Sequence, residues 1–200
     1  SYSVNVFNPM GAILAKTSGL SLKDHTQHVV DQARDWLDAF PFLEEKYAAQ
    51  TGEALRPQLL HAAEVHDQGK RHPTWQTACR KDAEEGGGRH LLTANLRHEL
   101  ASLDWAAKHG ESLTFPEKAA IAAHHGKLAY RHEHRWHEDA GGQFEPYWNE
   151  FYRQVHQWTF DAPDDLTEKA LNERFRIAGI RALLQLADTR ASIQEKETQN

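Results

Sequence analysis

The sequence predicts an all-α fold. Two long stretches repeat apolar residues at the 3.6-residue period of an α-helix, and no stretch keeps the strict apolar-polar alternation of a half-buried strand for long. Capping and turn residues divide the chain into segments of helical length. The 200 residues are enough to bury most of the surface that the unfolded chain exposes, and no repeat or linker divides them. We therefore expect a single helical domain over residues 1–200.

The first predicted helix begins after Ser21, a residue suited to the N-cap, and runs to about Phe40. Pro41 is expected to end it, because the residue before a proline disfavours the helical conformation. The apolar face has helical spacing and consists of Leu22, Thr26, Val29, Val30, Ala33, Trp36, Leu37 and Phe40.

Three further helices are predicted in the middle of the chain. They run from about Arg56 to Val65, from about Thr93 to Lys108, and onward from the capping box that Thr114 forms with Glu117. The Gly-rich residues 84–88 are expected to form a loop.

The last part of the chain combines a polar segment with two helical candidates. Residues 127–145 are polar and contain two adjacent glycines, whereas residues 144–158 are amphipathic and rich in aromatics. Pro163 separates the latter from the final predicted helix. That helix has a core-facing stripe formed by Ile177, Ile180, Leu184, Ala187 and Ala191.

Composition restricts the class of site. The chain has 14 histidines and only Cys79, which excludes a disulfide framework and a cysteine-rich zinc module, so a metal must be held by His and carboxylates. The net charge of −6 disfavours a bulk electrostatic hold on nucleic acid. Bound divalent cations would nevertheless supply positive charge where a phosphate must sit. With no apolar run of membrane-spanning length and no signal peptide, we expect a cytoplasmic protein without membrane contact.

The strongest chemical signal is a helix that ends in His66-Asp67, followed by Gly69 and Lys70. Adjacent helical side chains point about 100° apart, so this pair cannot chelate one ion as an i,i+4 pair does. A carboxylate has two oxygens and can bridge two ions, which makes Asp67 the candidate bridge. Lys70 lies one turn away and is expected to hold a substrate phosphate.

Other candidate ligands are spread along the chain. Asp188 lies on the flank of the final apolar stripe, where a lone buried carboxylate would be costly without a cation. His25 lies on the buried flank of the first predicted helix. His124 and His125 close a helix of small residues, and His98 follows Arg97. Neutral imidazole is the commonest protein ligand for metals.

In this order the residues resemble the HD nuclease domain of type I CRISPR effector helicase-nucleases, over nearly the whole chain. The tandem histidines and the Arg-His-Glu motif are specific to that branch, while the His-Asp doublet marks the wider HD superfamily. The matching residues are His25, His66-Asp67-Gln68-Gly69-Lys70 with Pro73-Thr74-Trp75-Gln76, Arg97-His98-Glu99 with Ser102, Ala122-Ala123-His124-His125-Gly126, and Ala187-Asp188 with Arg190 and Ser192. The family pattern often has Phe at Trp75 and Asp at His28.

The resemblance implies an HD-superfamily helical domain with a buried dinuclear site that cleaves single-stranded DNA. One ion would be held by His25, His66, Asp67 and Asp188, and the other by Asp67, His98, His124 and His125. The implied partners are a CRISPR surveillance complex and a helicase subunit or domain, whose motors this sequence lacks. We accordingly expect a stand-alone nuclease subunit or an excised domain, monomeric in isolation.

A two-metal phosphodiester hydrolase is the expected activity, as an endonuclease with possible additional exonuclease action. The mixed N/O ligand set suits Mn, Fe, Co or Ni better than Mg. Asp67 and Lys70 are the predicted catalytic residues. The predicted substrate-binding residues are Lys70, Arg97, Ser102, Arg131 and Arg135.

Two other functions remain open at the level of sequence: an HD phosphohydrolase acting on nucleotides or cyclic nucleotides, and a non-catalytic metal-binding docking domain. The polar loop with His132, His134 and His137 could bind another metal, but solvation or DNA contact by Arg131, Arg135 and Trp136 is favoured.

Overall fold

The computed structural model describes residues 11–125, 144, 146–147, 149–150 and 168–198. Within these residues the chain is helical, and the only extended pairing is an isolated antiparallel bridge between Leu14 and Ser21. The all-α prediction is confirmed. The elements are α1 (Leu22–Ala39), α2 (Phe42–Thr51), α3 (Leu55–Val65), the 3-10 helix η1 (Gln68–Arg71), α4 (Pro73–Glu85), α5 (Arg89–Thr93), α6 (His98–Lys108), α7 (Phe115–Ala122) and α10 (Glu168–Glu197).

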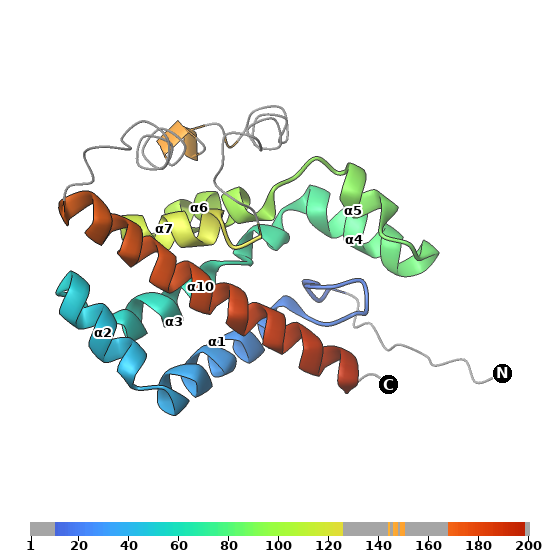
Figure 1. Ribbon diagram of the computed structural model, residues 1–200. Coiled ribbons are helices and arrows are strands. Elements are labelled where there is room, and N and C mark those ends of the chain that lie inside the picture. The colour runs from blue at the N-terminus through green and yellow to red at the C-terminus, as the bar shows by residue number, and fades with distance from the viewer. Residues whose placement is uncertain (1–10, 126–143, 145, 148, 151–167, 199–200) are drawn as a thin grey trace.

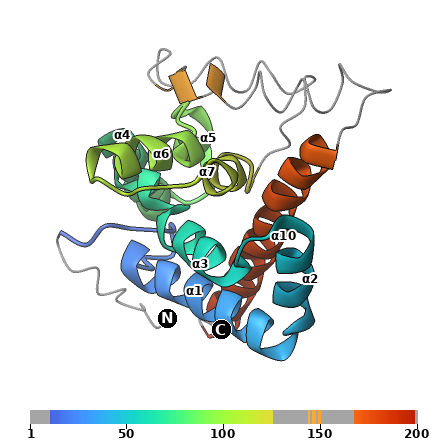
Figure 2. The same cartoon turned by 90° about the vertical axis from the view of Figure 1, so that its left-hand side faces the viewer.

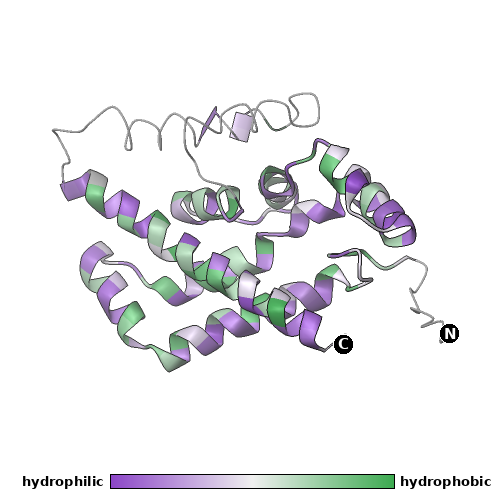
Figure 3. Ribbon diagram, turned by 45° about the vertical axis from the view of Figure 1, so that its right-hand side comes forward, coloured by the Kyte–Doolittle hydropathy of each residue, from purple (hydrophilic) through white to green (hydrophobic). Residues whose placement is uncertain are grey.

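The long helix α10 organises the fold. It crosses the molecule and packs against α1, α7, α2 and α3, while η1 packs against α6 (Figure 1). Helices α4 and α5 pack together and project to one side in Figure 1. Figure 2 shows α2 and α3 beside α10. The predicted stripe of α10 is buried, and Ile180, Leu184, Ala187 and Ala191 are fully enclosed. Hydrophilic residues (purple) alternate with hydrophobic ones (green) along the helices in Figure 3.

Helix α1 begins where the sequence predicts. The side chain of Ser21 accepts a hydrogen bond of 3.0 Å from the backbone N–H of Asp24, which satisfies one of the free donors at the helix start. The helix ends at Ala39, just before Pro41. The sequence does not predict α2, which starts directly after Pro41 and ends at Thr51, with Gly52 in the left-handed conformation as its C-cap.

The predicted helix from Thr93 to Lys108 is wrong at its N-terminal end, over residues 94–97. A short helix, α5, ends at Thr93, and α6 begins only at His98. Between them Asn95 has a φ of 48°, and Arg97 is extended, so the helical hydrogen bonding is interrupted. Because of this break, His98 is the first residue of α6 and does not lie in the interior of a longer helix.

The capping box at the start of α7 is confirmed, with reciprocal hydrogen bonds between Thr114 and Glu117. The α3 prediction is confirmed within one residue of its start. The Gly-rich loop is confirmed after α4 ends at Glu85. Residues 127–143 and most of the helical candidate at 144–158 lie outside the described residues.

In the part of the chain that the structure describes, no helix combines the length and apolar character that crossing a membrane requires.

Candidate metal centre

Five parts of the fold bring their His and Asp side chains to one buried cluster. His25 comes from α1, His66 and Asp67 from the end of α3, His98 from the first residue of α6, His124 and His125 from the turns after α7, and Asp188 from α10. The ligand atoms fall within 4.8 Å of one another in three overlapping groups: Asp67 with His98, His124 and His125; His25 with His66 and Asp67; and His66 with His124 and Asp188.

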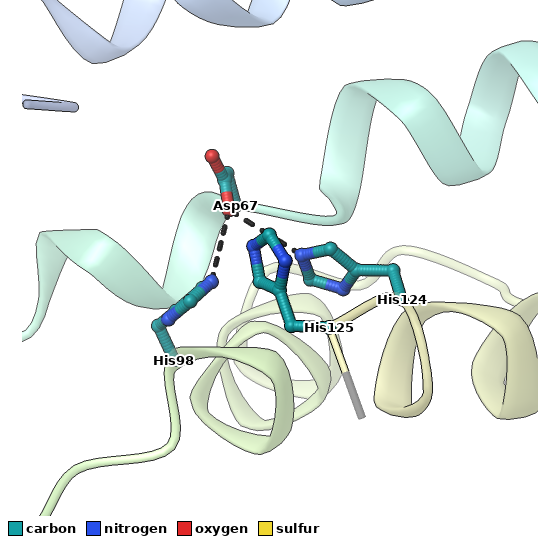
Figure 4. A group of neighbouring side chains, drawn as sticks. All are labelled: Asp67, His98, His124 and His125. Carbon is teal, nitrogen blue, oxygen red and sulfur yellow. Dashed lines mark ion pairs between the residues drawn. The ribbon is translucent and has the colours of Figure 1, made fainter. Parts of the chain in front are cut away.

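Asp67 lies at the centre, and its two oxygens face different histidines. Oδ1 lies 3.2 Å from His98 Nε2 and 3.7 Å from His124 Nε2 (Figure 4). Oδ2 lies 3.3 Å from His25 Nε2 and 3.5 Å from His66 Nε2. Ligand atoms that share one ion at about 2.1 Å lie roughly 3 Å apart, so these separations suit shared coordination.

Asp188 completes the cluster on the α10 side. Its Oδ1 lies 3.2 Å from His25 Nε2, and its Oδ2 lies 3.8 Å from His125 Nε2. His125 is the most exposed of these histidines, with 43% of its side chain accessible, whereas His66 and His124 are enclosed. The cluster therefore has a closed interior and an open side at His125.

The ligand atoms fit divalent cations because several are buried without a hydrogen-bond partner. These atoms are His25 Nε2, His66 Nε2, Asp67 Oδ1, His98 Nε2 and His124 Nε2. Buried polar atoms are normally satisfied, and leaving one unpaired costs about 1–3 kcal/mol. Five such atoms pointing at one small volume indicate a site for cations.

The other ring nitrogen fixes the tautomer of three of these histidines. Nδ1 of His66 lies 2.7 Å from the carbonyl of Ala63, and Nδ1 of His124 lies 2.6 Å from the carbonyl of Ile121. A carbonyl only accepts, so each Nδ1 must carry a proton, which leaves Nε2 as the ring atom that can bind a cation. In His25 the corresponding partner is a carboxylate, Oε1 of Glu195, at 2.8 Å. Such hydrogen bonds are the usual support of metal-binding imidazoles.

The protonation states of the site are mixed. Burial opposes protonation of His25, but hydrogen bonds to Asp188 and Asp67 raise its pKa to about 9, and the hydrogen bond to Asp67 likewise outweighs burial and raises the pKa of His124. A bound cation would therefore displace a proton from each of these two rings.

Burial lowers the pKa of His66 to about 4, and burial with the nearby His124 and His98 lowers the pKa of His125 to about 3, so both are neutral at pH 7. Burial opposes ionisation of Asp67, but Lys70 and His66 outweigh it and hold the pKa of the carboxyl well below its usual range. The anion is therefore available at neutral pH.

Gly69 and Ser102 connect η1, which directly follows Asp67, to α6, which begins with His98. A Cβ on Gly69 would lie 2.0 Å from the carbonyl oxygen of His98 and 2.5 Å from the backbone nitrogen of Ser102, so only glycine allows η1 to approach α6 this closely. The Ser102 hydroxyl accepts a 2.8 Å hydrogen bond from the N–H of Gly69 and lies 2.7 Å from the carbonyl of His66. Ser102 is fully buried. The hydroxyl is thus occupied by backbone groups, so the structure offers no support for the predicted contact between Ser102 and a substrate.

A family model described as "Cas3, HD domain" matches residues 14–195 of the chain. The chain belongs to the Cas3 HD-domain family. No curated protein and no solved structure gives a significant match. Membership of the Cas3 HD-domain family identifies a CRISPR-associated HD nuclease domain, and HD domains bind divalent metals, in agreement with the buried cluster.

Of the remaining predicted site residues of this Cas3 HD domain, Lys70 and Arg97 lie within the described part of the chain. Lys70 is 8% exposed, and its Nζ contacts Asp67. Arg97 lies 3.3 Å from Oε1 of Glu99, which is itself buried. Arg131 and Arg135 lie outside the described residues, as do His132, His134 and His137.

Glu195 is a further polar residue beside the cluster, and it is not among the residues predicted from the sequence of this Cas3 HD domain. This carboxylate is 6% exposed and contacts His25 and His28 through the same oxygen. His28 is 46% exposed at its side chain and faces Glu195, not Asp67. The missed signal is helical spacing, because Glu195 follows Asp188 by two turns and shares its face of α10.

Proposed function

We propose that this chain is a metal-dependent nuclease that hydrolyses phosphodiester bonds of single-stranded DNA by a two-metal mechanism. The observation that carries the proposal is the division of the Asp67 carboxylate between two sets of histidines, with Oδ2 facing His25 and His66 and Oδ1 facing His98 and His124. A carboxylate shared in this way is suited to bridging two divalent ions.

Two overlapping sets of residues would hold the ions. His25, His66, Asp67 and Asp188 form the first set, and Asp67, His98, His124 and His125 form the second. The mixture of imidazole and carboxylate ligands favours Mn, Fe, Co or Ni over Mg. When bound, the ions would activate a water molecule and neutralise the charge that develops on the phosphate.

The chain's own residues contribute orientation and access. The hydrogen bonds from Nδ1 of His66 and His124 to backbone carbonyls keep each Nε2 directed at Asp67. The partly exposed side of His125 is the proposed entrance for the scissile phosphate. Lys70, with its ammonium 2.6 Å from Oδ2 of Asp67, is close enough to the centre to contact that phosphate as well. Arg97, Arg131 and Arg135 remain predicted contacts to the strand.

The family supports the substrate class and the partners. A CRISPR context implies a DNA substrate, and we propose that it is the displaced single strand, delivered by a surveillance complex together with a helicase subunit or domain. The proposed action is endonucleolytic, with exonuclease action as a further prediction.

The test combines metal analysis with a choice of substrates. Purified, chelator-treated protein is titrated with Mn, Co, Ni and Mg, and is assayed on circular single-stranded DNA, duplex DNA and a panel of nucleotides and cyclic nucleotides. We expect close to two ions per chain and cleavage of the circular single strand. Turnover of nucleotides without DNA cleavage would replace the nuclease with a nucleotide phosphohydrolase. Stoichiometric metal without any hydrolysis would indicate a docking domain.

A further inference from the structure

A second group of side chains surrounds Glu195, near the end of α10 and on the far side of His25 from Asp67. Oε1 of Glu195 lies 2.8 Å from Nδ1 of His25 and 2.9 Å from Nδ1 of His28. Its Oε2 accepts a hydrogen bond from the ammonium of Lys16, which also donates to Ser192 at 2.8 Å. The carboxylate is 6% exposed, yet both oxygens are engaged by donors.

These contacts determine what Nδ1 of His25 must do. An ionised carboxylate only accepts hydrogen bonds, so Nδ1 is protonated and donates to Oε1 of Glu195. The ring is thereby fixed with Nε2 directed at Asp188 and Asp67, 3.2 and 3.3 Å away. His66 and His124 donate to neutral carbonyls of their own helices instead, so the charged partner distinguishes His25 from them.

The carboxylate is held in its ionised form. The ammonium of Lys16 contacts Oε2 of Glu195, and the ring nitrogens of His25 and His28 lie 2.8 and 2.9 Å from Oε1, so the buried carboxylate is compensated by donors on both oxygens. A buried anion behind an imidazole makes the opposite nitrogen a stronger donor to a cation and restricts rotation of the ring.

We propose that Glu195 is a positioning residue of the metal centre: it orients His25, fixes its tautomer and raises the affinity of the ion that His25 would share with Asp67. The proposal rests on the proposed function only in requiring that His25 bind a metal. Through Lys16 the same carboxylate also joins the segment before α1 to α10, a structural link that is separate from its contact with His25.

Glu195→Gln tests the proposal, because it removes the charge while nearly preserving the shape of the side chain. Two variants serve as controls. Glu197→Gln neutralises an exposed carboxylate on the same helix. Lys16→Met removes the ammonium that contacts Glu195 but keeps the bond between Glu195 and His25. The readouts are Mn²⁺ and Co²⁺ binding by calorimetry and the unfolding temperature of the metal-free protein.

We expect Glu195→Gln to weaken one of two binding events by about 10- to 100-fold and to leave the other within about twofold. Glu197→Gln should bind as the wild type does. Lys16→Met should lower the unfolding temperature but keep the affinity for both ions. Comparing Glu195→Gln with Lys16→Met distinguishes two roles of Glu195: orienting His25 for metal binding, and linking residue 16 to α10.

The outcomes for Glu195 and for the nuclease are distinguishable, since binding is read without DNA. Unchanged affinity in Glu195→Gln would overturn the positioning role and leave the nuclease intact. An equal loss of affinity in Lys16→Met would also overturn it, by assigning the effect to the structural link. Two ions in the wild type, weakened binding in Glu195→Gln and no DNA cleavage by either would support positioning while refuting the nuclease.

Discussion

The ammonium of Lys70 donates a 2.6 Å hydrogen bond to Oδ2 of Asp67, three residues earlier in the chain. Both residues are buried, and the turn that joins them is η1, which is packed against α6. The positive charge of Lys70 therefore lies beside the carboxylate that faces most of the histidines. In this position Lys70 can have one of two roles: it can support Asp67 in the candidate metal centre, or it can contact the substrate phosphate.

Replacing Lys70 by Met separates these roles. We expect the rate of DNA cleavage to fall by roughly 10²-fold, because a charge that can contact the scissile phosphate is lost. Metal content should be maintained, since removing a cation does not weaken the binding of other cations nearby. Rate under saturating Mn²⁺ and metal per chain by mass spectrometry are the measurements. A fall in metal content parallel to the rate would instead assign Lys70 to the support of Asp67.

Asp67→Ala should abolish cleavage and metal loading together, because one substitution removes a ligand from both proposed ions. In the wild type, metal at 100 times its dissociation constant stabilises the fold by about 2.7 kcal/mol and raises the unfolding temperature. That rise should vanish in Asp67→Ala. Thermal melts with and without Mn²⁺, together with assays on single-stranded DNA, provide the check. Retained nuclease activity in the variant would refute the dinuclear proposal.

Gly69→Ala should destabilise the protein by more than about 3 kcal/mol, because the new methyl group would overlap the backbone of His98 and Ser102. Gly110→Ala is the matched control. Gly110 has a φ of 71° with open space around its Cβ position, so its substitution should cost only about 1–2 kcal/mol. Denaturant unfolding of both variants without metal measures the difference, and equal losses would contradict the close approach of η1 to α6.

Asp82 offers a pH-dependent test away from the metal centre. Burial raises the pKa of its carboxyl, but hydrogen bonds of 2.8 Å from the N–H groups of Leu91 and His90 outweigh this and lower the pKa. A lowered pKa in the folded state gives stability that is present above the unfolded-state pKa and is lost as pH falls through the folded-state value.

The difference in unfolding free energy between wild type and Asp82→Asn should therefore be largest at neutral pH and shrink as the solution becomes acidic. Denaturant titrations of metal-free protein from pH 7 downward measure this difference. A difference independent of pH would show that the charge of Asp82 is not what stabilises the start of α5.

Much of the fold could be predicted because it follows short-range rules, whereas the two sets of candidate ligands were implied by the resemblance to the HD nuclease domain. Periodicity located α1 and the stripe of α10, and the capping box located the start of α7. The break before His98 was missed because it depends on the conformation of Asn95, which few local preferences determine. Glu195 was missed because its partners, Lys16 and His25, are close only in the folded chain.

Ser102 shows why a residue type alone is weak evidence of a role. Its place near His98 suggested contact with substrate, whereas the hydroxyl is buried between backbone groups of η1 and α3. Only the tertiary packing of α6 against η1 reveals this, and that packing in turn depends on the absence of a side chain at Gly69.

His25 and Asp188 lie near opposite ends of the described chain, 3.2 Å apart in the fold. During synthesis the histidine appears early, and its carboxylate partner appears only when the last helix has been made. A growing chain that has not yet reached α10 therefore has the histidines and Asp67 of the cluster but lacks Asp188. The candidate centre can therefore assemble only after α10 has been synthesised, because domains acquire their packed sites as whole units.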